Sequence, residues 1–234
     1  MEFSKLSAPT LKELFTEQLE NMILSGKLPI GEKLPPEREL AAMMQVSRSV
    51  VNSGLVEMAD KGFLEIVPRS GTYVADYRKK GKLETLVSIM KFNGGMLPDA
   101  DIRSILEIRK VLCKLAFELT IPRIKDNEAQ QLYDCAQELH KASSPAQAAM
   151  IVFNFDHLVC NFSGNTLLPL IFYSFKAPNT TLFERYFIRY GYESMCRRTD
   201  ILCRAIRQRD IGMAVDCLSL AIDDTISGEK SLYN

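Results

Sequence analysis

The chain has 234 residues, 47% of them hydrophobic, so it can bury one large core or, more economically, the cores of two domains. Its 29 basic and 29 acidic residues give a formal charge of zero, which excludes a chain-wide attraction to nucleic acid or to an anionic membrane. Any polyanion must therefore be bound by a local set of side chains.

Cysteine usage and hydropathy narrow the cellular context. The six cysteines form no C-x-x-C pair and are spread through helical patterns, which indicates reduced thiols rather than a disulfide framework. No apolar run reaches the roughly 20 residues that a membrane-spanning helix needs. The initial MEFSKLSAPTLKEL lacks the basic start and apolar core of a secretion signal. We therefore expect a cytoplasmic protein that makes no membrane contact.

Three helices are predicted near the beginning of the chain. In residues 9–26 the apolar side chains recur at helical spacing, and a glycine follows where a C-terminal cap belongs. Pro36 can open a second, short helix that ends near Gln45. Ser47 is a plausible N-cap for a third helix over residues 48–61. Two helices joined by three or four residues predict a helix-turn-helix.

The periodicity changes after the third helix. Residues 63–67 alternate like a half-buried strand, residues 68–71 have turn chemistry, and residues 72–74 form a second β-prone run. This pattern predicts a β-hairpin, or wing. A polar, glycine-containing segment follows and is typical of a linker. We therefore expect a first domain at 1–77, a linker at 78–83, and a second domain at 84–234.

The second domain is predicted to contain helices only. Its amphipathic segments, which make six or seven helices if neighbours fuse, cover residues 84–91, 99–120, 126–141, 145–162, 166–175, 180–189, 192–208 and 210–226. Short polar connections favour an antiparallel helical bundle. The predicted fold class is therefore mainly α, with an N-terminal winged helix-turn-helix domain followed by an all-α antiparallel bundle.

The third helix has the features of a DNA-reading element. Ser49 and Asn52 lie away from its apolar side, and Arg48 sits in the first turn, from where such helices reach base edges in the major groove. Arg38 and the wing-tip Arg69 can flank them, because a guanidinium grips a phosphate or a guanine with two bonds. A lone surface arginine is usually just solvated, and the first domain carries eight basic residues against eleven acidic ones. DNA binding must therefore come from the placement of a few cations.

Residues 34–74, LPPEREL followed by VSRSVVNSGLVEMADKGFLEIVPRSGTYV, resemble the winged-helix domain of the GntR family of bacterial transcription regulators. Relatives often carry arginine at the position of Asn52, which leaves the preferred base open. The resemblance implies a set of DNA-binding residues in the two short helices and the wing: Arg38, Ser47, Arg48, Ser49, Asn52, Arg69 and Gly71.

The helical part is similar to the effector domain of the FadR-type branch of that family. Residues 101–119, with Glu107-Ile108-Arg109, look like its first long helix, and Phe162-Ser163-Gly164-Asn165 looks like its A-S-G-N turn. The resemblance implies a homodimer that binds a palindromic double-stranded DNA operator and responds to a small-molecule effector.

Many effector domains of this type hold a divalent metal with one aspartate and three histidines, but this chain has only His140 and His157. By the resemblance His157 matches one ligand and Phe153 stands at the aspartate position, while the later histidine positions fall on Arg198 and Ala221. One useful imidazole cannot build such a site, and a single histidine is more often a core residue. We expect neither a metal nor another cofactor.

A pocket without a metal must hold its effector by other means, as in the fatty-acyl-responsive FadR proteins, which residues 175–187 also resemble. Arg109 lies on the apolar stripe of its helix, and a buried guanidinium needs an anionic or hydrogen-bonding partner. That partner is either internal, for example a salt bridge to Asp156, or a ligand carboxylate or acyl-carrier phosphate. The predicted effector is an acyl thioester or another lipophilic anion. The alternative is a small carboxylate, with or without a metal. The candidate effector-binding residues are Arg109, Phe153, His157, Tyr186 and Arg189.

An enzyme is the weaker hypothesis. His157 and Cys160 lie three residues apart on one predicted helix, but no neighbouring residue orients the base or forms an oxyanion hole. The sequence also has no glycine-rich phosphate loop. We therefore expect a binding protein without catalytic residues.

Overall fold

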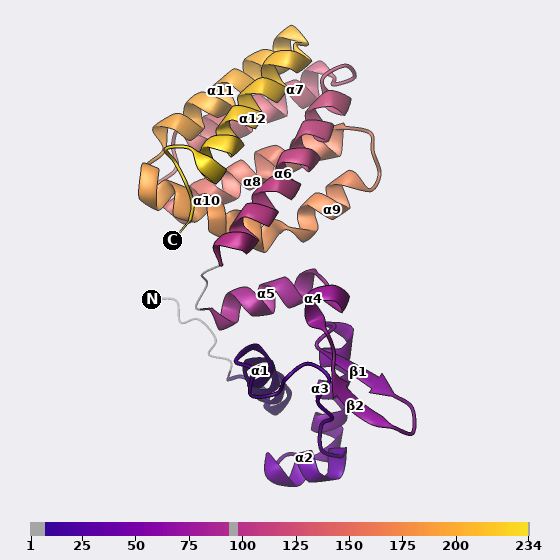
Figure 1. Cartoon of the computed structure of the whole chain (residues 1–234). Helices are drawn as coiled ribbons and strands as arrows, with labels where there is room; N and C mark the ends of the chain where they lie inside the picture. The colour runs from indigo at the N-terminus through magenta and orange to yellow at the C-terminus, as the bar shows by residue number, and fades with distance from the viewer. Residues whose placement is uncertain (1–7, 94–97, 234) are drawn as a thin grey trace, which may run out of the picture. The chain divides into compact units, whose positions relative to one another are not determined.

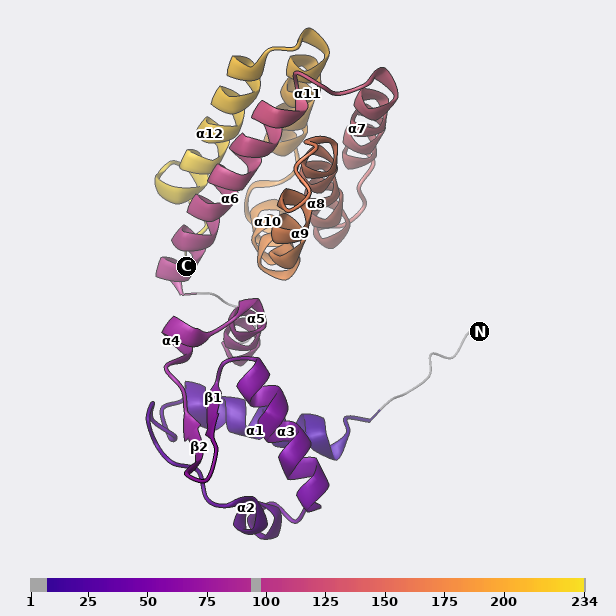
Figure 2. The same ribbon diagram turned by 90° about the vertical axis from the view of Figure 1, so that its right-hand side faces the viewer.

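A computed structural model describes residues 8–93 and 98–233 of the chain, with the side chain of Leu83 left out. Residues 1–7, which belong to the expected first domain, lie outside the described part. The structure is mainly α, with one two-stranded sheet among the described residues, and it divides into two compact units at residues 96 and 97 (Figures 1 and 2).

The first unit is a winged helix-turn-helix. Its helices α1 (Leu11–Leu24), α2 (Glu37–Met43) and α3 (Arg48–Asp60) match the three predicted ones closely. Gln45, in the turn between α2 and α3, has a φ of 53°, a left-handed conformation that lets the chain reverse within a few residues. The hydroxyl of Ser47 then caps α3.

The wing is an antiparallel pair of strands, β1 (Leu64–Val67) and β2 (Gly71–Val74), in which Leu64 pairs with Val74. One end of the hairpin is anchored in the core. The core consists of apolar residues from α1, α2, α3, the strands and the segments between them: Phe15, Leu19, Ile23, Leu28, Leu34, Leu40, Ala41, Val51, Leu55, Met58, Phe63, Leu64 and Val74. The other end of the hairpin is solvent-exposed.

The expected domain boundary requires a correction. The segment taken as a linker at 78–83 contains the short helix α4 (Tyr77–Lys80), and the following helix α5 (Leu83–Phe92) packs on α1 in the first unit. Thr85 and Ser88 of α5 are buried there. Lys91 of α5 also pairs with Glu17 of α1 at 2.8 Å. The prediction placed α5 in the second domain because a polar, glycine-containing segment precedes it, whereas its packing partner lies seventy residues earlier.

The second unit is a bundle of seven helices: α6 (Asp99–Thr120), α7 (Asp126–Leu139), α8 (Pro145–Phe162), α9 (Leu168–Ser174), α10 (Lys176–Tyr190), α11 (Glu193–Gln208) and α12 (Ile211–Ser227). Helix α8 is central and packs against α6, α7, α9 and α10, while α12 packs against α6 and α11 (Figure 2). Their bounds lie within two residues of the predicted ones, except that α10 begins four residues earlier. Three charged side chains are buried in this unit: Arg109, Asp156 and Arg198.

Candidate DNA interface and effector cavity

Helix α3 presents its polar side to solvent because its apolar side is fixed in the core. The hydroxyl of Ser47 accepts a hydrogen bond from the amide of Val50 at 3.2 Å, so the helix begins at Arg48. Gly54 lies where α3 crosses α1, and a Cβ at that position would overlap the ring of Phe15. The close crossing leaves Arg48, Ser49 and Asn52 exposed on one surface of the first two turns.

Asn52 is held by a residue of the neighbouring helix. Its amide nitrogen donates to Oε1 of Glu37 at 3.2 Å. An ionised carboxylate only accepts hydrogen bonds, so the nitrogen of Asn52 must face Glu37 and its oxygen must face away. An asparagine in this orientation offers an acceptor and a second N–H, the pair of groups that recognises the N6 and N7 edge of adenine.

The wing adds cations beside α3. Arg69 is exposed at the tip with a φ of 62°, and Gly71 has a φ of 133°, a conformation that glycine accommodates most easily. A Cβ on Gly71 would lie 2.8 Å from Cε of Lys33, whose amine lies 5.8 Å from the centre of the Tyr73 ring. Arg38 is exposed on α2. Lys33 is a candidate DNA contact that sequence reasoning missed, although it directly precedes the LPPEREL motif.

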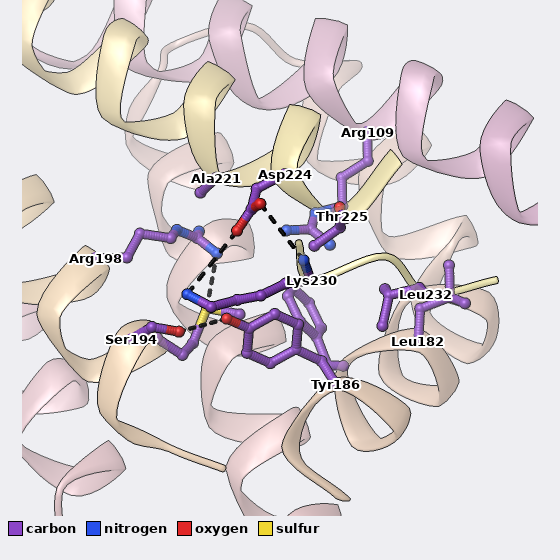
Figure 3. Close-up of a pocket in the computed structure, with 12 residues that line it drawn as sticks. Arg109, Leu182, Tyr186, Ser194, Arg198, Ala221, Asp224, Thr225, Lys230 and Leu232 are labelled. Atoms are coloured by element: carbon purple, nitrogen blue, oxygen red, sulfur yellow. Dashed lines mark hydrogen bonds and ion pairs between the residues drawn. The ribbon is translucent and has the colours of Figure 1, made fainter. Parts of the chain in front are cut away.

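A cavity of about 70 Å³ lies within the helical unit (Figure 3). It is enclosed by α6, α10, α11 and α12 together with the segment that follows α12. Its wall contains Arg109, Leu182, Phe183, Tyr186, Ser194, Met195, Arg198, Ala221, Asp224, Thr225, Lys230 and Leu232. Tyr186 and Ser194 are hydrogen-bonded to each other through their hydroxyls.

Of the two arginines in this wall, Arg198 has a buried carboxylate partner and Arg109 does not. Nη2 of Arg198 lies 2.8 Å from Oδ1 of Asp156, with both side chains buried. Arg109 forms no ion pair within residues 8–93 and 98–233, and its Nε has no hydrogen-bond partner there. The guanidinium lies over the ring of Phe183, 4.1 Å from its centre. Burial lowers the pKa of Arg109, and the charge of Asp156 opposes that effect only in part. Asp156 alone therefore does not balance the charges of Arg109 and Arg198.

Comparison with known proteins identifies the family. Residues 11–74 match the model of the gntR family of bacterial regulatory proteins. The HTH-type transcriptional regulator Mce2R of Mycobacterium tuberculosis is 32% identical over 167 residues, which cover 71% of this chain and 68% of that protein. This chain belongs to the GntR family. The family consists of DNA-binding transcription regulators, so this GntR protein is a regulator rather than an enzyme.

Two further comparisons extend beyond the first unit. The fatty acid metabolism regulator protein of Shewanella pealeana is 27% identical to this GntR regulator over 166 residues, 70% of this chain and 67% of that protein. The solved structure of Lar, which controls the expression of the Listeria monocytogenes agr system, shares its fold with a TM-score of 0.66. That likeness holds at 14% identity over 94% of this chain and 97% of the other.

Several residues predicted to bind the effector lie outside the wall of the cavity. Phe153 and His157 stack on each other with ring centres 5.9 Å apart, and Phe153 also stacks on Phe172 of α9 at 5.3 Å. Burial lowers the pKa of His157 there. Arg189 donates to backbone carbonyls of the segment after α12. Arg109 and Tyr186 do line the cavity.

The described residues at the positions of the family's metal ligands do not form a metal site. Across residues 8–93 and 98–233, no three His, Cys, Asp or Glu side chains gather as a metal site would require. Arg198, at one of the expected histidine positions, instead directs its guanidinium at Asp156, so a protein cation already neutralises that carboxylate.

No helix in the described part of the chain is long and apolar enough to cross a bilayer.

Proposed function

We propose that this GntR regulator works in the cytoplasm as a two-fold symmetric dimer, places one α3 helix per protomer in the major groove of a palindromic operator, and changes its DNA affinity when an anion enters the cavity. A single α3 offers few base contacts, and symmetry supplies a second set one helical turn of DNA away. The proposal that an anion enters the cavity rests on Arg109, which is buried without an ion-pair partner.

The dimer is supported by an exposed apolar stripe on α6. Ile108, Val111 and Leu115 lie at helical spacing on one side of this helix, and Val111 is 67% exposed. Covering such a stripe with the same stripe of a second copy buries apolar surface on both chains. Light scattering should give the mass of two chains, and a monomer both on and off DNA would contradict the proposal.

DNA reading is tested at Arg48. We expect Arg48→Ala to weaken binding to the selected operator by about 1–3 kcal/mol, because the guanidinium sits in the first turn of α3 where base edges are reached. The control is Arg204→Ala, which removes an exposed arginine of α11. Fluorescence polarisation with duplexes selected from a random pool gives both affinities. Equal operator affinity of Arg48→Ala and Arg204→Ala at moderate salt would exclude Arg48 from the interface.

The size of the cavity favours one of two kinds of effector. Pockets for drug-sized ligands have volumes of about 300–1,000 Å³, whereas this one has about 70 Å³. The geometry therefore best supports a small carboxylate or a similar compact anion bound at Arg109. An acyl thioester is the second candidate, supported by similarity to the fatty acid metabolism regulator protein, and would require the helices to separate around its chain.

Chain length distinguishes the two candidates. Carboxylates and coenzyme A thioesters of two to sixteen carbons are titrated into the protein with operator DNA present. Burial of an acyl chain contributes about 0.8 kcal/mol per methylene, so the affinity for a lipophilic effector rises steadily with length. A compact anion site binds the shortest members best. Linkage requires that any ligand which loosens DNA also binds less tightly to the DNA complex.

A further inference from the structure

The segment that follows α12 forms one wall of the cavity. Helix α12 ends at Ser227, and the chain then turns back across α10. Leu232 is only 2% exposed, and its amide donates to the carbonyl of Thr225 at 3.1 Å. A buried leucine and a backbone hydrogen bond fix residues 228–233 as part of the folded unit.

Helix α10 holds this segment through its backbone. Arg185 donates to the carbonyl of Leu232 at 3.0 Å, and Arg189 donates to the carbonyl of Tyr233 at 2.6 Å. The hydroxyl of Tyr190 donates to the carbonyl of Ser231 at 2.5 Å. Because these contacts use main-chain oxygens, the side chains of the segment remain available for the cavity.

Lys230 enters the cavity from this segment. Its side chain extends across the cavity between Tyr186 and the group formed by Asp224 and Arg198 (Figure 3). The amine lies 3.9 Å from Oδ2 of Asp224, at the outer limit of an ion pair. At the preceding position of α12, Asp223 pairs with Lys110 at 2.7 Å. Lys230 is therefore loosely held by its carboxylate. With Lys230 counted, three cations, Arg109, Arg198 and Lys230, stand against the two carboxylates of Asp156 and Asp224.

We propose that Lys230 supplies a further cation to the anion bound at Arg109 and Arg198, exchanging its long ion pair with Asp224 for the ligand. This inference rests on the proposed anion site. Without an anion the three cations repel one another, which keeps the amine on the Asp224 side. A bound anion attracts all three cations, including the amine of Lys230. Residues 228–233 are then drawn onto the ligand and close the cavity over it.

The experiment uses the full-length protein with inorganic phosphate and acetate as probes, at constant ionic strength. Affinity is obtained from the rise in unfolding temperature of the helical unit with anion concentration. Lys230→Met keeps the apolar stem and removes the charge. Lys110→Met is the matched control, since it breaks another lysine–aspartate pair on α12 without touching the cavity. We expect about a tenfold lower affinity in Lys230→Met, wild-type affinity in Lys110→Met, and most of the affinity restored in Lys230→Arg.

Hydrogen exchange gives a second readout. The amide of Leu232 should exchange more slowly when phosphate is added to the wild-type protein, and this slowing should be absent in Lys230→Met. Equal affinity and equal slowing in Lys230→Met and Lys110→Met would overturn the role of Lys230 and leave the anion site intact. If neither probe binds the wild-type protein more tightly than Arg109→Met, the proposed anion site is wrong and the role of Lys230 fails with it.

Discussion

Replacing Arg109 by methionine should make the helical unit more stable. The guanidinium is 6% exposed, has no carboxylate in ion-pair range, and leaves its Nε without a hydrogen-bond partner in the described part of the chain. Burying an ion costs several kcal/mol even after the protein relaxes. The contact with Phe183 offsets about 0.5–2 kcal/mol of that cost, and attraction to the charge of Asp156 offsets a further part.

The balance of these terms predicts that Arg109→Met raises the free energy of unfolding by about 1–2 kcal/mol. Methionine adds little packing cost of its own, because it is unbranched and fills the space of the arginine stem. For a unit of this size 1 kcal/mol moves the unfolding temperature by roughly 4 °C, so the transition should rise by about 4–8 °C. Circular dichroism of the full-length protein during heating measures it.

The matched substitution is Arg198→Met, which removes the same charge from the same cavity but strands the buried carboxylate of Asp156. Breaking a buried pair from one side costs about 3–5 kcal/mol. The two variants should therefore shift the transition in opposite directions. A fall of several degrees in Arg109→Met would refute the reasoning, because it would mean that the guanidinium has a stabilising partner within the protein.

Three further predictions concern other parts of the chain. Gly54→Ala should destabilise the first unit by about 1–3 kcal/mol because its Cβ overlaps Phe15. Gly212→Ala should stabilise the second unit by about 0.5–1 kcal/mol, because its Cβ meets only Oδ1 of Asp210, at an ordinary 3.4 Å. Urea unfolding measures both. Burial lowers the pKa of His157 from 6.5, so the unfolded chain takes up the proton first and stability falls as the pH drops below about 6.5. The difference between the urea midpoints at pH 7.5 and pH 5.5 should shrink in His157→Phe. The difference should persist in His140→Phe, which removes an exposed histidine and keeps His157. Operators selected by the wild-type protein should carry adenine opposite Asn52, and Asn52→Arg should shift that position to guanine; an unchanged base would contradict the assigned amide orientation.

Local signals were sufficient for most helix bounds but not for two features. Helix α10 begins at Lys176, earlier than predicted, because Pro178 lies in its first turn, where the amide of the residue would have no intrahelical partner anyway. The apolar pattern had placed the start of this helix at residue 180. The position of the domain boundary depended on the packing of α5 against α1, which joins segments distant in sequence and has no local signature.

The two candidate sites differ in how far the sequence could predict them. Exposure of Arg48 and Asn52 follows from the apolar period of α3, since the opposite side is occupied by its core residues. In α8 successive residues point about 100° apart, so Asp156 faces Arg198 while His157 faces α9. The resemblance to the family's metal ligands selected His157 as a candidate effector-binding residue. Lys230 lies in a segment without periodicity, and only the folded chain brings it to the cavity.

A buried guanidinium without an ion-pair partner couples stability to effector binding. By the prediction above, leaving Arg109 without a carboxylate lowers the stability of the helical unit, so a bundle selected for stability alone would place an apolar side chain at position 109. An anion that supplies the missing charge recovers this free energy, and the recovered amount is available to shift the protein between conformations that differ in DNA affinity. A coupling of 1–3 kcal/mol corresponds to a change in operator affinity of about 5–150-fold. If Arg109→Met both raises the unfolding temperature and removes the effect of anions on DNA binding, then the loss of stability and the response to the effector arise from the same side chain.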